Sequence, residues 1–103
     1  MYATPPAVTR ALNDFGGHVH TWRILNRLTM AQVADRAGIS PDTLARIESG
    51  KGASLENTFR VMRALGMLDT WVQAADPLNT DVGRLRAIAL LPDRVRPPTP
   101  GRS

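Results

Sequence analysis

The chain has 103 residues, of which 43% are hydrophobic and 21% charged, a composition typical of one globular domain with a single core. It contains no cysteine, which excludes a disulfide framework and a zinc site with thiolate ligands. The sequence holds no run of roughly 18 apolar residues and does not begin like a secretory signal. We therefore expect a cytoplasmic protein that needs no membrane and no cofactor.

The net charge of +4 favours a polyanionic partner such as nucleic acid. The basic residues are nearly all arginine, and Lys51 is the only lysine. Arginine suits phosphate and guanine because its planar guanidinium donates two parallel hydrogen bonds. A GC-rich coding sequence would also enrich arginine, so both explanations of this bias stay open.

Residues 1–6 form a proline-containing lead that we expect to be flexible. Apolar residues then recur at steps of three and four, which predicts one helical face. These residues are Val8, Leu12, Phe15, Val19, Trp22 and Leu25. Gly16 and Gly17 interrupt the pattern, so the segment is either one bent helix or two short helices.

Two short helices are predicted next. Thr29 is suited to cap the first, whose inward residues are Val33, Ala34 and Ala37, and Gly38 can end it in the left-handed conformation.

Ser40 is suited to cap the second, with Pro41 at its first position, where a missing N–H costs little. The buried stripe of this second helix is Leu44 and Ile47.

The remaining pattern predicts two more helices and a tail. Ser54 caps a fourth helix, with Leu55, Phe59, Met62 and Leu65 inward and Gly66 at its end. A short fifth helix carries Leu68, Trp71, Val72 and Ala75. We therefore predict an all-α, five-helix domain over residues 7–76 and an extended or partly helical tail over 77–103. A tail helix would be capped by Thr80 or Asp81 and would end at Leu90 or Leu91, and the stretch from Pro92 on would be extended or disordered.

Residues 29–51 predict a helix, a tight glycine turn and a second helix, an arrangement that can place the second helix in the major groove of DNA. Ala34 is small enough for a close crossing of the two helices. Leu44 and Ile47 would anchor the second helix, which leaves four residues to face outward. These are Asp42, Thr43, Ala45 and Arg46.

This segment resembles the lambda-repressor-like, or XRE, helix-turn-helix family over about residues 18–76. The matching residues are Ala34, Gly38, Ile39, Ser40, Leu44, Ile47, Glu48, Gly50, Lys51, Ser54, Leu55, Glu56, Asn57, Ala64, Leu65 and Gly66. The resemblance implies a structural ion pair between Arg23 and Glu48. The sequence departs from the family at Met30, where a phosphate-contacting glutamine is common, and at Pro41, which lacks a backbone donor.

Base reading would consequently fall to Asp42, Thr43 and Arg46, with Arg46 suited to guanine and Asp42 to a cytosine amine. Phosphate contacts would come from Thr43 and from three residues near the following loop and helix. These three are Lys51, Ser54 and Asn57. Capping alone is an alternative role for Ser40 and Ser54.

Residues 75–96 resemble the C-terminal ends of small regulators that accompany HipA-type kinase toxins, carried by Asp76-Pro77, Asp81, Gly83, Leu85, Leu91-Pro92 and Arg94-Val95-Arg96. This resemblance implies a HipB-type antitoxin that represses its own operon. A solitary or phage-type repressor and an interaction module that has lost DNA binding are the alternatives. Two half-sites improve specificity, so we expect a homodimer that uses Leu68, Trp71 and residues 81–91.

An enzyme is not expected. His18 and His20 lie two positions apart on a predicted helix and face different directions, and no acidic cluster or cysteine completes a metal site around them.

Overall fold

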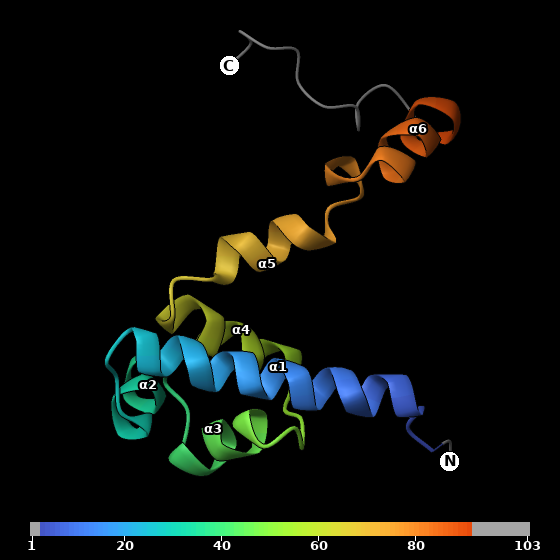
Figure 1. Cartoon of the computed structure of the whole chain (residues 1–103). Coiled ribbons are helices and arrows are strands. Elements are labelled where there is room, and N and C mark those ends of the chain that lie inside the picture. The colour runs from blue at the N-terminus through green and yellow to red at the C-terminus, as the bar shows by residue number, and fades with distance from the viewer. Residues whose placement is uncertain (1–2, 92–103) are drawn as a thin grey trace, which may run out of the picture. The chain divides into compact units, whose positions relative to one another are not determined.

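The computed structural model describes residues 3–91, and this part of the chain is helical without any strand. The elements are α1 (Pro6–Leu25), α2 (Met30–Ala37), α3 (Pro41–Glu48), α4 (Leu55–Ala64), α5 (Leu68–Ala75), the 3-10 helix η1 (Pro77–Asn79) and α6 (Asp81–Leu90) (Figure 1). The all-α prediction is confirmed. The segment from Pro92 on, predicted to be extended, lies outside the described residues.

Backbone contacts divide the chain into two compact units, residues 1–69 and residues 70–103. The sequence pattern alone placed this division after residue 76. Each unit is described by itself below. No helix in the described range is both long and apolar enough to cross a membrane.

The first helix runs without interruption through the glycine pair, so the two-helix alternative is wrong. Gly16 is buried, and a Cβ atom built on it would lie 2.5 Å from the Ile47 carbonyl oxygen and 2.7 Å from that of Glu48. Gly17 has open space where a Cβ would be. Gly16 therefore allows α1 to approach the carboxyl end of α3 closely, and it does not break the helix.

The core of the first unit forms where α1 packs on α3 and where α2 packs on α3 and α4. Its buried apolar residues are Val19, Val33, Ala34, Ala37, Leu44, Ile47, Val61, Met62 and Leu65. Four residues predicted to face inward are instead exposed: Val8, Trp22, Leu25 and Leu55. Val8 and Leu55 lie in the first turns of their helices and Leu25 in a last turn. The spacing of apolar residues identifies one face of a helix, but it does not show how much of the length of that face other helices cover.

The second unit has a much smaller interior. Ala87 is the only buried residue between Thr70 and Leu91. The predicted tail helix is confirmed as α6: the Thr80 hydroxyl accepts from the Gly83 amide and caps it, and it ends at Leu90. The short η1 before it was not predicted. Asp76 caps η1 by accepting from the Leu78 amide at 2.9 Å.

Candidate nucleic-acid interface

The start of α2 is fixed by a reciprocal cap. The Gln32 amide donates to the Thr29 hydroxyl at 3.1 Å, and the Thr29 amide donates to the Gln32 side-chain oxygen at 2.8 Å. Thr29 was predicted as a cap, whereas the partner role of Gln32 was missed, although a threonine followed three residues later by glutamine is its signature. Gln32, the one glutamine of α2, therefore serves the cap. The first helical position, where a phosphate-contacting glutamine was considered above, is occupied by Met30.

The turn between α2 and α3 depends on Gly38. This residue has φ 70° and ψ 35°, the left-handed conformation that glycine adopts without a Cβ clash. The Ile39 amide donates to the Ala34 carbonyl at 3.0 Å and closes the turn. A Cβ on Gly38 would also lie 3.2 Å from an Arg60 guanidinium nitrogen, so α4 packs close to the turn.

The helix α3 begins as predicted. The Ser40 hydroxyl accepts from the Thr43 amide at 3.1 Å, and Pro41 follows at the first helical position. Leu44 and Ile47 are buried. The exposed side of the helix carries Pro41, Asp42, Ala45 and Arg46, so one face of α3 is held by the core and the opposite face is open to a ligand.

Thr43 differs from the expectation that it faces outward freely. It is half-buried, and its hydroxyl lies 2.9 Å from the Ser40 hydroxyl. Its position at the third residue of α3 turns it back toward the cap, so the two hydroxyls share a hydrogen bond.

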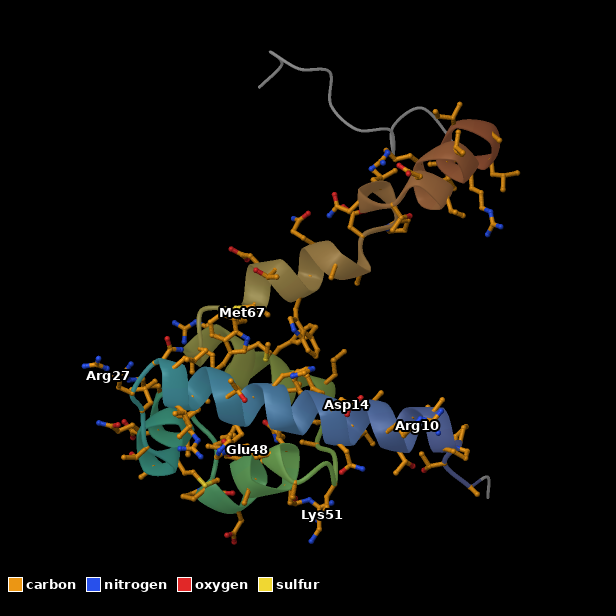
Figure 2. All side chains as sticks on the ribbon, viewed as in Figure 1. Arg10, Asp14, Arg27, Glu48, Lys51 and Met67 are labelled. Atoms are coloured by element: carbon orange, nitrogen blue, oxygen red, sulfur yellow. The ribbon has the colours of Figure 1, made fainter. Side chains whose placement is uncertain are left out.

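Arg46 and Lys51 lie at the carboxyl end of α3. The Arg46 guanidinium donates to the Lys51 carbonyl oxygen at 3.3 Å, and the Lys51 amide donates to the Arg46 carbonyl at 2.9 Å. Both side chains are exposed, and Figure 2 shows Lys51 pointing away from the helices. The two cations predicted to contact DNA are thus brought together beside the outward face of α3.

The predicted phosphate ligands on α4 are its cap and first turn. The Ser54 hydroxyl accepts from the Asn57 amide at 3.0 Å, so Ser54 is a cap and Asn57 is half-buried next to it. The amides of Leu55 and Glu56 have no hydrogen-bond acceptor in the described part of the chain. Such first-turn amides are suited to a phosphate oxygen. The Glu56 carboxylate next to them pairs with Arg60 at 3.0 Å.

A buried ion pair fixes the carboxyl end of α3 against α1. The Arg23 guanidinium donates from Nε to Glu48 Oε2 at 2.8 Å and from Nη2 to Oε1 at 3.1 Å, and Nη1 donates to the Leu28 carbonyl at 3.2 Å. Arg23 is 8% exposed. The structure therefore brings together the two residues that the family resemblance pairs, and Figure 2 labels Glu48 where α1 faces α3.

His20 is a third member of this cluster that sequence reasoning missed. Its Nδ1 lies 3.0 Å from Glu48 Oε1 and 3.1 Å from Arg23 Nη2. In a neutral ring Nδ1 either donates to Glu48 or accepts from Arg23, according to the tautomer. The spacing of His20 and Arg23, three residues apart on one helix, was the available signal.

The charges in the cluster stabilise each other. The hydrogen bond to Glu48 raises the pKa of Arg23 against the opposing effect of burial. Burial alone would raise the pKa of Glu48, but hydrogen bonds from Arg23 and His20, with the nearby positive charge, outweigh it and lower that pKa. Glu48 is therefore an anion at neutral pH. Its role is structural, because its oxygens are directed into the fold.

The site is the exposed face of α3, flanked by the cations Arg46 and Lys51 and by the amino terminus of α4. The described residues contain no group of histidine and acidic side chains that could hold a metal ion. A glycine turn joins α3 to the helix before it. These features define the class of DNA-binding helix-turn-helix proteins.

The helix-turn-helix family model matches residues 19–72, which is more than half of the chain. The chain therefore belongs to the helix-turn-helix family of the lambda-repressor-like, or XRE, type. No curated protein and no solved structure matches it. Residues 6–18 of α1, which include Gly16, lie outside the family match.

Proposed function

We propose that this regulator reads a specific operator with the outward face of α3. The observation that carries the proposal is the division of α3 into a buried side, Leu44 and Ile47, and an exposed side with Asp42 and Arg46. A helix anchored in this way can enter the major groove without exposing the core.

The roles of the individual residues follow from their chemistry. Arg46 would donate two hydrogen bonds to guanine, and Asp42 would accept from a cytosine amine. Thr43 has its hydroxyl near Ser40, so its methyl group is the part best suited to a base. Phosphates would be held by Lys51 and by the start of α4, through Ser54, Asn57 and the free amides beside them.

Dimer formation is a second part of the proposal. One helix as short as α3 contacts few base pairs, and a two-fold dimer doubles the sequence that is read. We assign the contact to Leu68 and Trp71, both half-buried in α5, and to Leu85 and Ile88, which are exposed on α6. Sedimentation that shows only monomer at micromolar concentration would contradict this assignment.

The finer proposal is an antitoxin that represses its own operon and binds a HipA-type kinase toxin. It rests on the resemblance of residues 75–96. A reading frame for such a kinase beside this gene would support it, whereas an integrase or other prophage genes there would favour a solitary repressor.

The test is fluorescence anisotropy with the DNA upstream of the gene and with a scrambled duplex, at several salt concentrations. We expect tighter binding to the upstream DNA and affinity that falls steeply with salt, because bound cations displace counterions from the phosphates. Equal weak binding to both duplexes would instead favour an interaction module, an alternative motivated by Met30, Pro41 and Asp42.

The substitution Arg46→Ala should weaken specific binding by about 1 to 3 kcal/mol, while the thermal unfolding temperature stays near that of the wild type. Arg10→Ala is the matched control, because Arg10 is an exposed arginine on α1, away from α3. Equal losses for both variants would show only a general effect of charge. No loss for Arg46→Ala would remove that residue from the reading face.

A further inference from the structure

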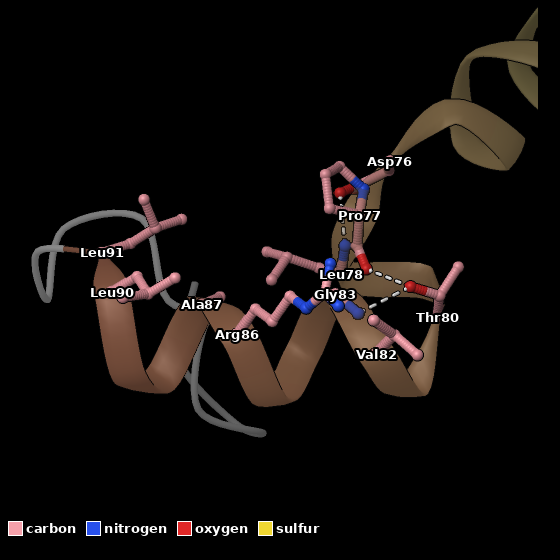
Figure 3. Close-up of a pocket in the computed structure, with 10 residues that line it drawn as sticks. All are labelled: Asp76, Pro77, Leu78, Thr80, Val82, Gly83, Arg86, Ala87, Leu90 and Leu91. Carbon is pink, nitrogen blue, oxygen red and sulfur yellow. Dashed lines mark hydrogen bonds between the residues drawn. The ribbon is translucent and has the colours of Figure 1, made fainter.

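A groove of about 570 Å³ lies between η1 and α6 in the second unit (Figure 3). We call it the η1–α6 groove. Its lining residues are Asp76, Pro77, Leu78, Thr80, Val82, Gly83, Arg86, Ala87, Leu90 and Leu91. Figure 3 shows Leu90 and Leu91 at one end and Val82 at the other, with Arg86 between them.

The groove is held in shape by hydrogen bonds between its two walls. The Thr80 hydroxyl donates to the Pro77 carbonyl at 2.9 Å and accepts from the Gly83 amide at 2.9 Å. The Arg84 guanidinium donates to the Leu78 carbonyl at 2.9 Å and also pairs with Asp81. Gly83 has no side chain, and a Cβ there would collide with the Pro77 carbonyl. A groove fixed in this way loses little entropy when it is filled.

The apolar walls of the groove are largely uncovered. Leu90 is 76% exposed, Val82 56% and Leu91 48%, whereas Ala87 at the floor is buried. A unit as short as residues 70–103 cannot bury enough apolar surface to be stable by itself. Exposed apolar side chains gathered along a groove in this way are suited to contact with another protein.

The charge at the groove indicates what kind of protein would cover it. Arg86 has no hydrogen bond or ion pair in the described residues, in contrast to Arg84. Residues 70–103 hold five arginines and three aspartates; of the aspartates, Asp76 caps η1 and Asp81 pairs with Arg84. A second copy of the same segment would bring the same positive charge, so an acidic occupant is favoured over self-pairing at this groove.

We propose that the η1–α6 groove binds an amphipathic helical segment of an acidic partner protein. An apolar side chain of that segment would lie over Ala87 between Val82 and Leu90, and a carboxylate beside it would accept two hydrogen bonds from Arg86. This inference rests on the toxin contact proposed for residues 75–96 and extends it to a groove of the second unit. It does not require that α3 reads DNA.

The experiment uses the full-length protein and two labelled helical peptides of equal length. Both peptides carry leucines at spacings of three and four, and their flanking positions are glutamate in one and lysine in the other. We expect the glutamate peptide to bind more tightly by about tenfold or more, as measured by anisotropy. Leu90→Ser should abolish most of this binding, and Arg86→Glu should reverse the preference between the peptides.

Val72→Ser is the matched control, because Val72 is 49% exposed on α5, does not line the groove and has no part in the proposed dimer contact. Its binding of the glutamate peptide should equal that of the wild type. Equal losses for Val72→Ser and Leu90→Ser would overturn the assignment of the groove. So would self-association that Leu90→Ser abolishes, because a second copy would then be the occupant. DNA binding is read separately through Arg46→Ala, so failure of one proposal is distinguishable from failure of the other.

Discussion

The two units of this protein differ in how they use apolar side chains. The first buries nine apolar residues contributed by α1, α2, α3 and α4, with Leu65 directly after α4. The second buries Ala87 and leaves Val82, Leu85, Ile88, Leu90 and Leu91 exposed. Local hydrogen bonds, such as the double role of the Thr80 hydroxyl, form its helices and turn nevertheless. Regular secondary structure therefore does not imply a stable core, and within the described residues only the first unit has the interior that folding requires.

The difference between the units should be largest in native-state amide exchange. Amides at Leu44 and Val61 should exchange only through global unfolding, because their side chains are fully buried in the first unit. Amides in α6 should exchange about a thousandfold faster, since few apolar contacts oppose local opening. Equal protection of α6 and α3 in the isolated protein would contradict the comparison.

The buried ion pair is the most sensitive point of the first unit. Glu48→Gln should lower the free energy of unfolding by about 3 to 5 kcal/mol, because it leaves the buried Arg23 cation without its anion. Glu56→Gln is the control and should cost less than about 1 kcal/mol, since its pair with Arg60 is exposed. Denaturant unfolding measures both, and similar small losses would show that the Arg23–Glu48 pair adds little.

Acid provides a second readout for the same variant. The folded-state pKa of Glu48 is lowered, so its contribution to stability is present above the unfolded-state pKa of about 4.3. That contribution is lost as the pH falls further through the folded-state pKa. The wild type should therefore lose stability more steeply than Glu48→Gln below about pH 4. Parallel curves would contradict the lowered pKa.

The next largest change in the free energy of unfolding is expected where α1 crosses α3. Gly16→Ala should lower the free energy of unfolding by about 1 to 3 kcal/mol, because its Cβ would collide with backbone atoms of Ile47 and Glu48. Gly17→Ala, one position along, meets nothing and should stabilise by about 0.5 to 1 kcal/mol through helix propensity. Opposite shifts in the melting temperature are the expected result, and equal shifts would place the crossing elsewhere.

The smallest effect is expected at Arg27, which has φ 57° after the end of α1. Arg27→Gly should raise the free energy of unfolding by about 0.5 to 1 kcal/mol, because glycine adopts this conformation without a Cβ clash. Arg36→Gly, within α2, should instead lower it by a similar amount. Thermal unfolding of the two variants checks the sign.

Sequence pattern was sufficient for the helix-turn-helix, because caps and turns are encoded locally. Ser40, Ser54 and Gly38 each act within three or four residues of their own position. It was insufficient where the reason lies far along the chain. Gly16 reads as a helix breaker until the carbonyl groups of α3 are seen against it, and His20 reads as a surface residue until Glu48 is beside it.

The same limit applies to the reading face and to the second unit. The pattern identified which side of α3 is open, but it did not reveal that Thr43 turns toward Ser40. It predicted α6 from Thr80, whereas the groove under η1 depends on a bond between Arg84 and the Leu78 carbonyl that no spacing rule predicts. Contacts between side chains and distant backbone atoms are determined by packing, which a single sequence does not display.

The separation of roles along α3 has a consequence for how such a regulator could diverge. Pro41, Asp42 and Ala45 are exposed, whereas Leu44, Ile47 and Glu48 hold the helix in place. Under the proposed reading of DNA by α3, substitutions at the exposed positions would change base preference while leaving the frame intact. Duplicated genes could therefore acquire different operators through a few mutations on one helix face, and their products could become insulated from each other in the same cell without first losing the ability to fold.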